Sequence, residues 1–187
     1  MASTAYIAGV VDKLTRKYKT RDPYELSQLL GIKIHHKDLQ KKLKGFFFCQ
    51  SRQKNIVIDS NVNRILERIL IAHELGHAIL HQEVALMRGF QEMEVLESRQ
   101  SMPEETEANL FSAELLLEDD VVLEHLRYES FFEAARSLYV PAALLDYKFL
   151  LLRSKGYYLN TQEIHKANYL REDLGAYETG EHFTDEC

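Results

Sequence analysis

The segment His73-Glu-Leu-Gly-His77 holds two histidines and a glutamate at a spacing that suits metal chemistry. Side chains four residues apart on a helix share one face, about 6 Å apart. Two imidazoles at this spacing can therefore reach one tetrahedral zinc ion from the same side. Glu74 projects toward the edge of such a site, where its carboxylate can take a proton from metal-bound water. The pattern predicts hydrolytic zinc chemistry, with His73 and His77 as ligands and Glu74 as general base.

The surrounding residues strengthen this interpretation. The motif lies within residues 62–81, whose apolar side chains cover almost the whole circumference of a helix, which is typical of a buried helix. An unpaired polar group in such a place costs about 2–7 kcal/mol. Three ionisable groups together need compensation, and a metal ion supplies it. The alternative is a helix with two ordinary histidines satisfied by local hydrogen bonds.

A hydrolytic zinc site also needs a third protein ligand and one open position. A second helix, expected to begin at Ser101-Met-Pro-Glu104, carries Glu105 and Asn109 on one face. Glu105 can ligate the metal, and Asn109 can hold a ligating histidine through a hydrogen bond. The alternative for Glu105 is stabilisation of the helix N-terminus through the helix dipole. Glu107 lies about 160° around the helix from Glu105, so we expect it to face solvent.

His81 continues the histidine row by one more helical turn. It lies too far along the axis to bind the same ion, so we expect it to be structural or to support a ligand from behind. The longer zinc pattern with a third histidine requires glycine at position 80 and histidine at position 83. This chain has Leu80 and Glu83 there, which excludes that pattern.

Composition limits the remaining possibilities. The 187 residues suit one domain, which we place at residues 1–174, with a disordered acidic tail at 175–187. The net charge of −6 and the absence of a dominant basic cluster argue against nucleic acid as the main partner. No apolar run is long enough to span a bilayer, and no signal peptide is recognisable. Two cysteines, Cys49 and Cys187, make no disulfide framework, so we expect a cytoplasmic protein.

Hydrophobic periodicity and capping signals predict the elements that position the motif. Helices are expected over residues 4–18, 23–30, 62–81, 103–117, 120–128, 131–138 and 141–154, and strands over 32–34, 46–50 and 55–59. The polar segment Ser51–Lys54 between the last two strands indicates a hairpin. Residues 82–100 show no period and are expected to be a loop, and Asn160–Glu163 is expected to begin a final helix.

Two segments together resemble the ImmA/IrrE family of zinc metallopeptidases, which occurs in bacteria and their mobile elements. They are Ile71-Ala-His-Glu-Leu-Gly-His-Ala-Ile-Leu-His81 and Glu105-Thr-Glu-Ala-Asn-Leu-Phe-Ser-Ala-Glu-Leu-Leu116. The resemblance covers roughly residues 20–156. The chain departs from the family at Ser112, which replaces the usual alanine, and after Leu116, where the family often has proline. Both departures concern the geometry at the end of the helix and not the metal.

The resemblance implies an α+β, zincin-like fold, with a small antiparallel sheet packed on the buried motif helix and other helices around it. It supports Glu105 as the third zinc ligand. It also implies cleavage of a repressor, often one with a helix-turn-helix DNA-binding part. The strand Phe46–Gln50 is our candidate for a sheet edge that holds an extended peptide beside the zinc, although its phenylalanines can equally be core residues.

Two alternatives from other functional classes stay open. The first is a non-catalytic regulatory binding module, against which an open zinc site with an intact Glu74 argues. The second is a DNA-binding regulator, because residues 131–137 and 141–151 loosely imitate helix-turn-helix spacing; the second segment is mostly apolar and favours a core helix. The residue that stabilises the oxyanion stays open as well. The candidates are Tyr128, Tyr157, Tyr158 and His125.

Overall fold

Helices and a small sheet make up residues 2–40, 43–81 and 103–159, which are the residues that the computed structural model describes. The elements are α1 (Thr4–Tyr18), α2 (Pro23–Leu29), β1 (Ile32–Lys37), β2 (Gly45–Gln50), β3 (Gln53–Asp59), α3 (Arg64–Leu80), α5 (Pro103–Leu116), α6 (Asp119–Tyr128), α7 (Phe131–Ser137) and α8 (Ala142–Ser154). The fold is therefore α+β, and the predicted helices appear within one or two residues of their expected ends. The predicted loop at 82–100, the cap at Ser101, the helix start at 160–163 and the tail at 175–187 lie outside the described residues.

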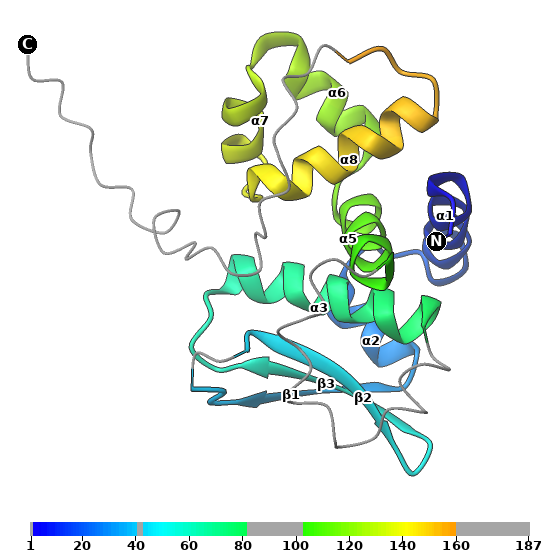
Figure 1. The fold of residues 1–187 in the computed structure, drawn as a ribbon, viewed down its shortest axis with the longest axis vertical. Helices are drawn as coiled ribbons and strands as arrows, with labels where there is room; N and C mark the ends of the chain where they lie inside the picture. The colour runs from blue at the N-terminus through cyan, green and yellow to red at the C-terminus, as the bar shows by residue number, and fades with distance from the viewer. Residues whose placement is uncertain (1, 41–42, 82–102, 160–187) are drawn as a thin grey trace, which may run out of the picture.

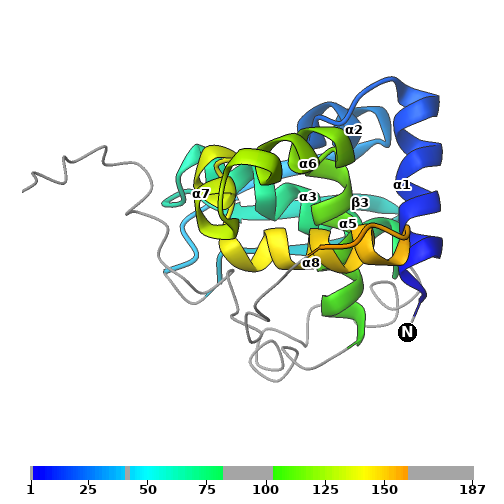
Figure 2. The ribbon, with the colours of Figure 1, turned by 90° about the horizontal axis from the view of Figure 1, so that it is seen from above.

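The elements form layers (Figure 1). The sheet lies at one side, α3 crosses one of its faces, α5 packs on α3, and α6–α8 lie farthest from the sheet. Seen from above, α1 runs along one side of the molecule, next to α5 and one end of α8 (Figure 2). The site helix α3 is thus covered by the sheet on one side and by α5 on the other. Among the described residues, no helix is long and apolar enough to cross a membrane.

The sheet is mixed, which corrects the expectation of a purely antiparallel one. Its strand order is β1-β3-β2; β2 pairs with β3 antiparallel, and β1 pairs with β3 parallel. The β2–β3 turn is also tighter than predicted. It consists of Ser51 and Arg52 alone, whose φ values of 50° and 66° are those of a type I′ turn. The predicted edge position of β2 is confirmed for the described part of the chain.

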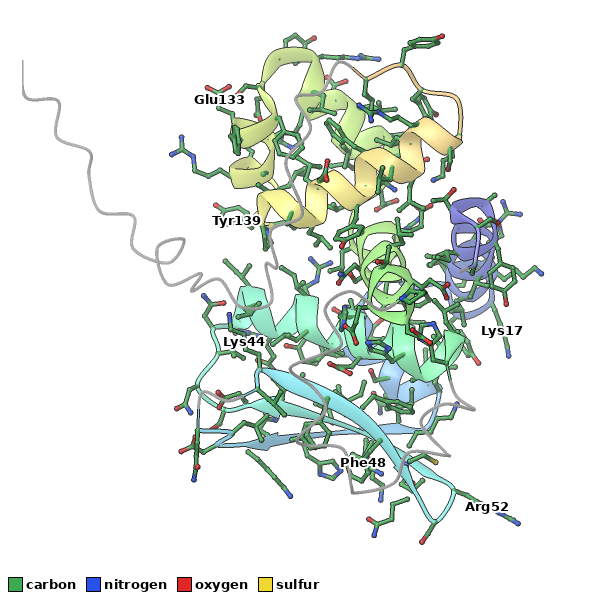
Figure 3. All side chains as sticks on the ribbon, viewed as in Figure 1. Lys17, Lys44, Phe48, Arg52, Glu133 and Tyr139 are labelled. Atoms are coloured by element: carbon green, nitrogen blue, oxygen red, sulfur yellow. The ribbon has the colours of Figure 1, made fainter. Side chains whose placement is uncertain are left out.

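The pleat of β2 separates its three phenylalanines. Phe47 pairs with Ile56 and packs against the core under α3. Phe46 and Phe48 point to the other face, where their ring centroids are 5.8 Å apart. Figure 3 shows Phe48 on the face turned away from α3 and Arg52 at the tip of the hairpin. Only one of the three is therefore a residue of the main core.

A buried ionic cluster ties the outer helices to α5. The Nζ atom of the fully buried Lys148 lies 2.7 Å from Glu114 and 2.5 Å from Asp119. Lys155 contacts the same two carboxylates at 2.6 and 2.7 Å. Two positive and two negative groups therefore balance one another, which is the condition under which charges can be buried. The cluster joins α5, α6 and α8, and Arg21 adds hydrogen bonds to the last carbonyl groups of α5.

Candidate metal centre

The middle of α3 is buried on all sides, which places the predicted ligand His73 and the predicted general base Glu74 in the interior. Every residue from 69 to 76 is buried, and His73 and Glu74 are only 2% and 6% exposed. The helix begins at Asn63, whose side chain accepts a hydrogen bond from the Leu66 amide at 2.8 Å. His77, one turn after His73, is partly exposed. The row of histidines thus runs from the core toward the end of the helix.

Helix α5 brings a carboxylate to the two histidines. The Nε2 atoms of His73 and His77 are 3.1 Å apart. The two carboxylate oxygens of Glu105 lie 3.3 Å from His73 Nε2 and 3.4 Å from His77 Nε2. The three side chains form a group that could hold a metal ion. The structure therefore brings together His73, His77 and Glu105, as the spacing on each helix predicted.

The distances in this group fit a tetrahedral zinc site. Ligand atoms about 2.0–2.1 Å from a tetrahedral zinc ion lie about 3.3 Å from one another. The three observed separations, 3.1, 3.3 and 3.4 Å, are all close to that value. Two imidazole nitrogens and one carboxylate are also a donor set that zinc accepts in catalytic sites. The 3.3 and 3.4 Å separations involve the two different oxygens of Glu105, and the residues present fit a zinc ion in type and approximate spacing.

The three side chains of this group shift one another's pKa values. Burial lowers the pKa of His77 to about 4, with the positive charges of neighbouring histidines adding to the effect against Glu105. For His73, burial also acts to lower the pKa, but the hydrogen bond and charge of Glu105 and the charge of Glu74 raise it overall. Burial acts to raise the pKa of Glu105, and its two histidine partners lower it well below its usual range. Glu105 is therefore an ionised ligand candidate at neutral pH.

A glycine allows the two helices to come this close. A Cβ added at Gly76 would lie 2.9 Å from the Ala108 Cα and 3.2 Å from the Ala108 carbonyl oxygen. Such distances are shorter than normal contacts, so the backbone of α5 fits against α3 only because position 76 has no side chain. Ala108 is three residues after Glu105 on the same helix. The position of Glu105 beside the histidines therefore depends on Gly76.

Glu74 lies near the start of the edge strand of the sheet. Its Oε1 atom would be 3.7 Å from a Cβ at Gly45, the first residue of β2. The predicted general base is thus beside the start of the edge strand that we proposed for peptide binding. Its charge also acts on His73.

Asn109 lies on the same face of α5 as Glu105 and is buried. It acts on His73 through a side-chain hydrogen-bond interaction that raises the pKa of the histidine. His73 Nδ1, however, makes no hydrogen bond of normal geometry among the described residues. Asn109 is therefore close to His73. Its predicted support of a ligand stays a prediction.

Tyr147 on α8 is a polar residue that the sequence reasoning missed. Burial raises its pKa, a hydrogen bond with Asn109 opposes that shift, and the charges of Asp146 and Glu105 add to it. Its phenol is therefore close enough to Asn109 and Glu105 for both to affect its pKa. The four candidates proposed from the sequence differ from it: Tyr128 and Tyr158 are 82% and fully exposed, Tyr157 is also exposed, and His125 pairs with Glu129 at 3.1 Å. The apolar period of residues 141–154 concealed Tyr147, because it favoured a purely structural helix.

Glu107 corrects another expectation. It does face away from Glu105, but it is buried and not solvated, at 7% exposure. His81 Nε2 lies 3.0 Å from its carboxylate. His81 itself contacts His77, with the two Nδ1 atoms 3.2 Å apart. The predicted support of a ligand by His81 therefore has a geometric basis, and Glu107 belongs to the same chain of contacts.

Comparisons with known proteins agree with this geometry. A family model for peptidase family M78, described as "IrrE N-terminal-like domain", matches residues 28–149. An "uncharacterized immunity region protein 2" of Bacillus phage phi105 is 37% identical over 145 residues, which are 77% of this chain and 89% of that protein. The metallopeptidase ImmA of Bacillus subtilis (strain 168) is 28% identical over 157 residues, 82% of this chain and 90% of that protein. Because the matched region includes the sheet, the site helix α3 and the Glu105 helix α5, the chain belongs to the ImmA/IrrE family of metallopeptidases.

Proposed function

We propose that this chain is a zinc-dependent endopeptidase with a zincin-like fold, and that it cleaves a cytoplasmic repressor-type protein with a helix-turn-helix part. The observation that carries the proposal is the convergence of His73, His77 and Glu105 at 3.1–3.4 Å, beside the buried Glu74. The names of the relatives, an immunity region protein and a metallopeptidase, are consistent with it.

The proposed roles follow from the geometry. His73, His77 and Glu105 would hold the zinc ion, with His81 and Asn109 behind the histidines. When bound, zinc would act as a Lewis acid that lowers the pKa of water to about 7 and polarises a peptide carbonyl. The Glu74 carboxylate would accept the proton of the attacking water and deliver it to the nitrogen of the leaving amine. Its burial excludes competing solvent from this transfer.

The edge strand β2 gives the substrate a place to bind. In the described part of the chain its outer edge pairs with no other strand, so an extended peptide can add to it by backbone hydrogen bonds. The start of β2 lies next to the Glu74 carboxylate. A peptide bound there would pass in front of the general base. This arrangement favours cleavage within an extended segment of a protein.

The test is co-incubation with a candidate repressor, such as one encoded by a neighbouring gene, with cleavage followed by mass spectrometry. Glu74→Gln should keep zinc and partner binding but lose about 10²–10⁴-fold in cleavage rate, because glutamine cannot accept the proton. Glu67→Gln is the matched control: Glu67 lies on the same helix and pairs with His36 at 2.7 Å. It should leave cleavage unchanged.

The binding-module alternative predicts a different result for the same variant. If Glu74→Gln releases the partner fully without cleaving it, the protein acts by binding and the enzymatic proposal is wrong. DNA binding is less favoured, because α8 buries most of its length against the core. A band shift that a substitution in α8 abolishes without unfolding the protein would support that alternative instead.

A further inference from the structure

Behind His77, on the side of its ring away from the metal group, lies a chain of polar contacts. His77 Nδ1 is 3.2 Å from His81 Nδ1, and His81 Nε2 is 3.0 Å from Glu107 Oε2. The other oxygen of Glu107 accepts a hydrogen bond from the Ala2 amide. The side chains of His81 and Glu107 are each only 10% exposed. The chain of contacts thus joins the end of α3, the middle of α5 and the segment before α1.

The chemistry of each group determines which atom donates and which atom accepts a proton in this series of contacts. An ionised carboxylate can only accept hydrogen bonds, so Glu107 requires a proton on His81 Nε2. Neutral His81 then has a bare Nδ1, which can only accept. The remaining partner, His77 Nδ1, must therefore donate. That leaves His77 with a bare Nε2, which is the atom beside His73 and Glu105.

A competing arrangement explains why this direction matters. Glu105 Oε1 lies 3.4 Å from His77 Nε2, so the carboxylate could instead hold a proton on that nitrogen. A proton there would occupy the position that a metal needs, because only a bare imidazole nitrogen binds a metal. An acceptor on the opposite side of the ring favours the other tautomer. His81 provides that acceptor, and Glu107 determines which of its nitrogens is bare.

We propose that Glu107, acting through His81, sets the tautomer and orientation of His77 for metal binding. Both are positioning residues, and the inference rests on the proposed metal centre. Partners of this kind behind a ligating histidine typically change metal affinity by about 10–100-fold. Here two imidazoles in series transmit the effect of one carboxylate. The surroundings of Glu107 agree: burial acts to raise its pKa, but the hydrogen bonds from His81 and Ala2 lower it overall.

The test measures zinc affinity in the full chain by competition with a chromophoric chelator, together with thermal unfolding of the metal-free protein. His81→Ala should weaken zinc binding about 10–100-fold, because His77 loses its acceptor. His81→Asn should stay within about 3-fold of wild type, since the amide oxygen can replace Nδ1 as acceptor. In zinc-bound protein, the His77 Nδ1 proton should exchange slowly with water in wild type and in His81→Asn, and rapidly in His81→Ala.

Glu107→Gln completes a double-mutant cycle. A glutamine can donate as well as accept, so it should cost about 10-fold in zinc affinity where His81 is present. In the His81→Asn background it should cost less than about 2-fold, because the shorter amide no longer connects position 107 to His77. Glu129→Gln is the matched control, since it removes the carboxylate that pairs with His125 of α6. Zinc affinity should not change in this variant.

The outcomes separate the inference from the proposed function. Tight zinc binding by wild type, with unchanged affinity in His81→Ala and Glu107→Gln, would overturn the inference alone. Equal losses from Glu107→Gln in both backgrounds would also overturn it, because Glu107 would then act by another route. A wild-type chain that binds no zinc would overturn the metal centre itself, and the inference with it.

Discussion

Gly76 on α3 lies at the contact with α5, and these two helices carry the proposed ligands. Adding one methyl group there therefore tests whether this close contact positions the ligands. In Gly76→Ala the new Cβ would begin 2.9 Å from the Ala108 Cα and 3.2 Å from the Phe111 Cβ. Carbon atoms in normal contact are about 3.5–4.0 Å apart. Relief of the first contact therefore requires α5 to move away from α3 by about 0.6–1.1 Å.

This displacement is large on the scale of a metal site. Glu105 is one helical turn before Ala108 and moves with it, whereas metal–ligand distances tolerate only about ±0.2 Å. We expect zinc affinity to fall by at least about 10-fold. The metal-free protein should change less. Overpacking costs about 1–3 kcal/mol, and the better helix propensity of alanine returns about 1 kcal/mol. The net loss should be about 0–2 kcal/mol.

Gly9 provides the matched control, because it lies within α1 and a Cβ there would meet nothing within 4 Å. Gly9→Ala should stabilise the metal-free protein by about 0.5–1 kcal/mol and leave zinc affinity unchanged. Urea unfolding in the presence of chelator gives the stabilities, and chelator competition gives the affinities. If Gly76→Ala matches Gly9→Ala in both measurements, α3 and α5 do not approach as closely as described, and our account of how Glu105 is positioned is wrong.

Two further predictions concern the outer helices. Tyr147→Phe should keep zinc and change KM little. If the phenol stabilises developing charge in the reaction, kcat should fall by about 10–10²-fold. An unchanged kcat would limit the role of Tyr147 to contact with Asn109. Asp119 is paired with Lys148 and Lys155, and although burial acts to raise its pKa, these partners lower it overall. A carboxyl group whose pKa is lower in the folded protein stabilises it above the unfolded pKa of about 3.9, and this contribution is lost as pH falls toward the folded value. Unfolding free energies measured with chelator from about pH 5 to about pH 3 should therefore fall less steeply in Asp119→Asn than in wild type; parallel curves would contradict the pairing.

The metal group could be predicted from the sequence because its geometry is mostly local. His73 and His77 share a face through helical spacing alone, and Glu105 and Asn109 share one for the same reason. A single further assumption, that the two helices pack together, brings Glu105 to the histidines. Gly76 was a sign of that contact within the motif itself, because a glycine in the middle of a buried helix indicates close approach of another backbone.

The strand pairing could not be predicted in the same way. The alternation of Ile32 and Ile34 suits a strand in either a parallel or an antiparallel pair. The residues of β1 therefore do not indicate its direction relative to β3. The β2–β3 hairpin shows the same limit on a smaller scale. Ser51 and Arg52 adopt positive φ without glycine or asparagine, so the usual residue signals of a two-residue turn were absent.

The direction of Glu107 on the helical wheel was predicted correctly, but its exposure to solvent was not. The helical wheel placed it away from Glu105, and that direction holds. The error was to equate "away from the metal" with "toward solvent". Because α5 crosses α3, the side chains of α5 meet α3 at more than one level, and the face that turns away from His73 meets His81 instead. A residue's neighbours depend on the crossing of two helices, which neither sequence period contains. The one carboxylate assigned to solvent is therefore the one that can orient a proposed ligand from behind.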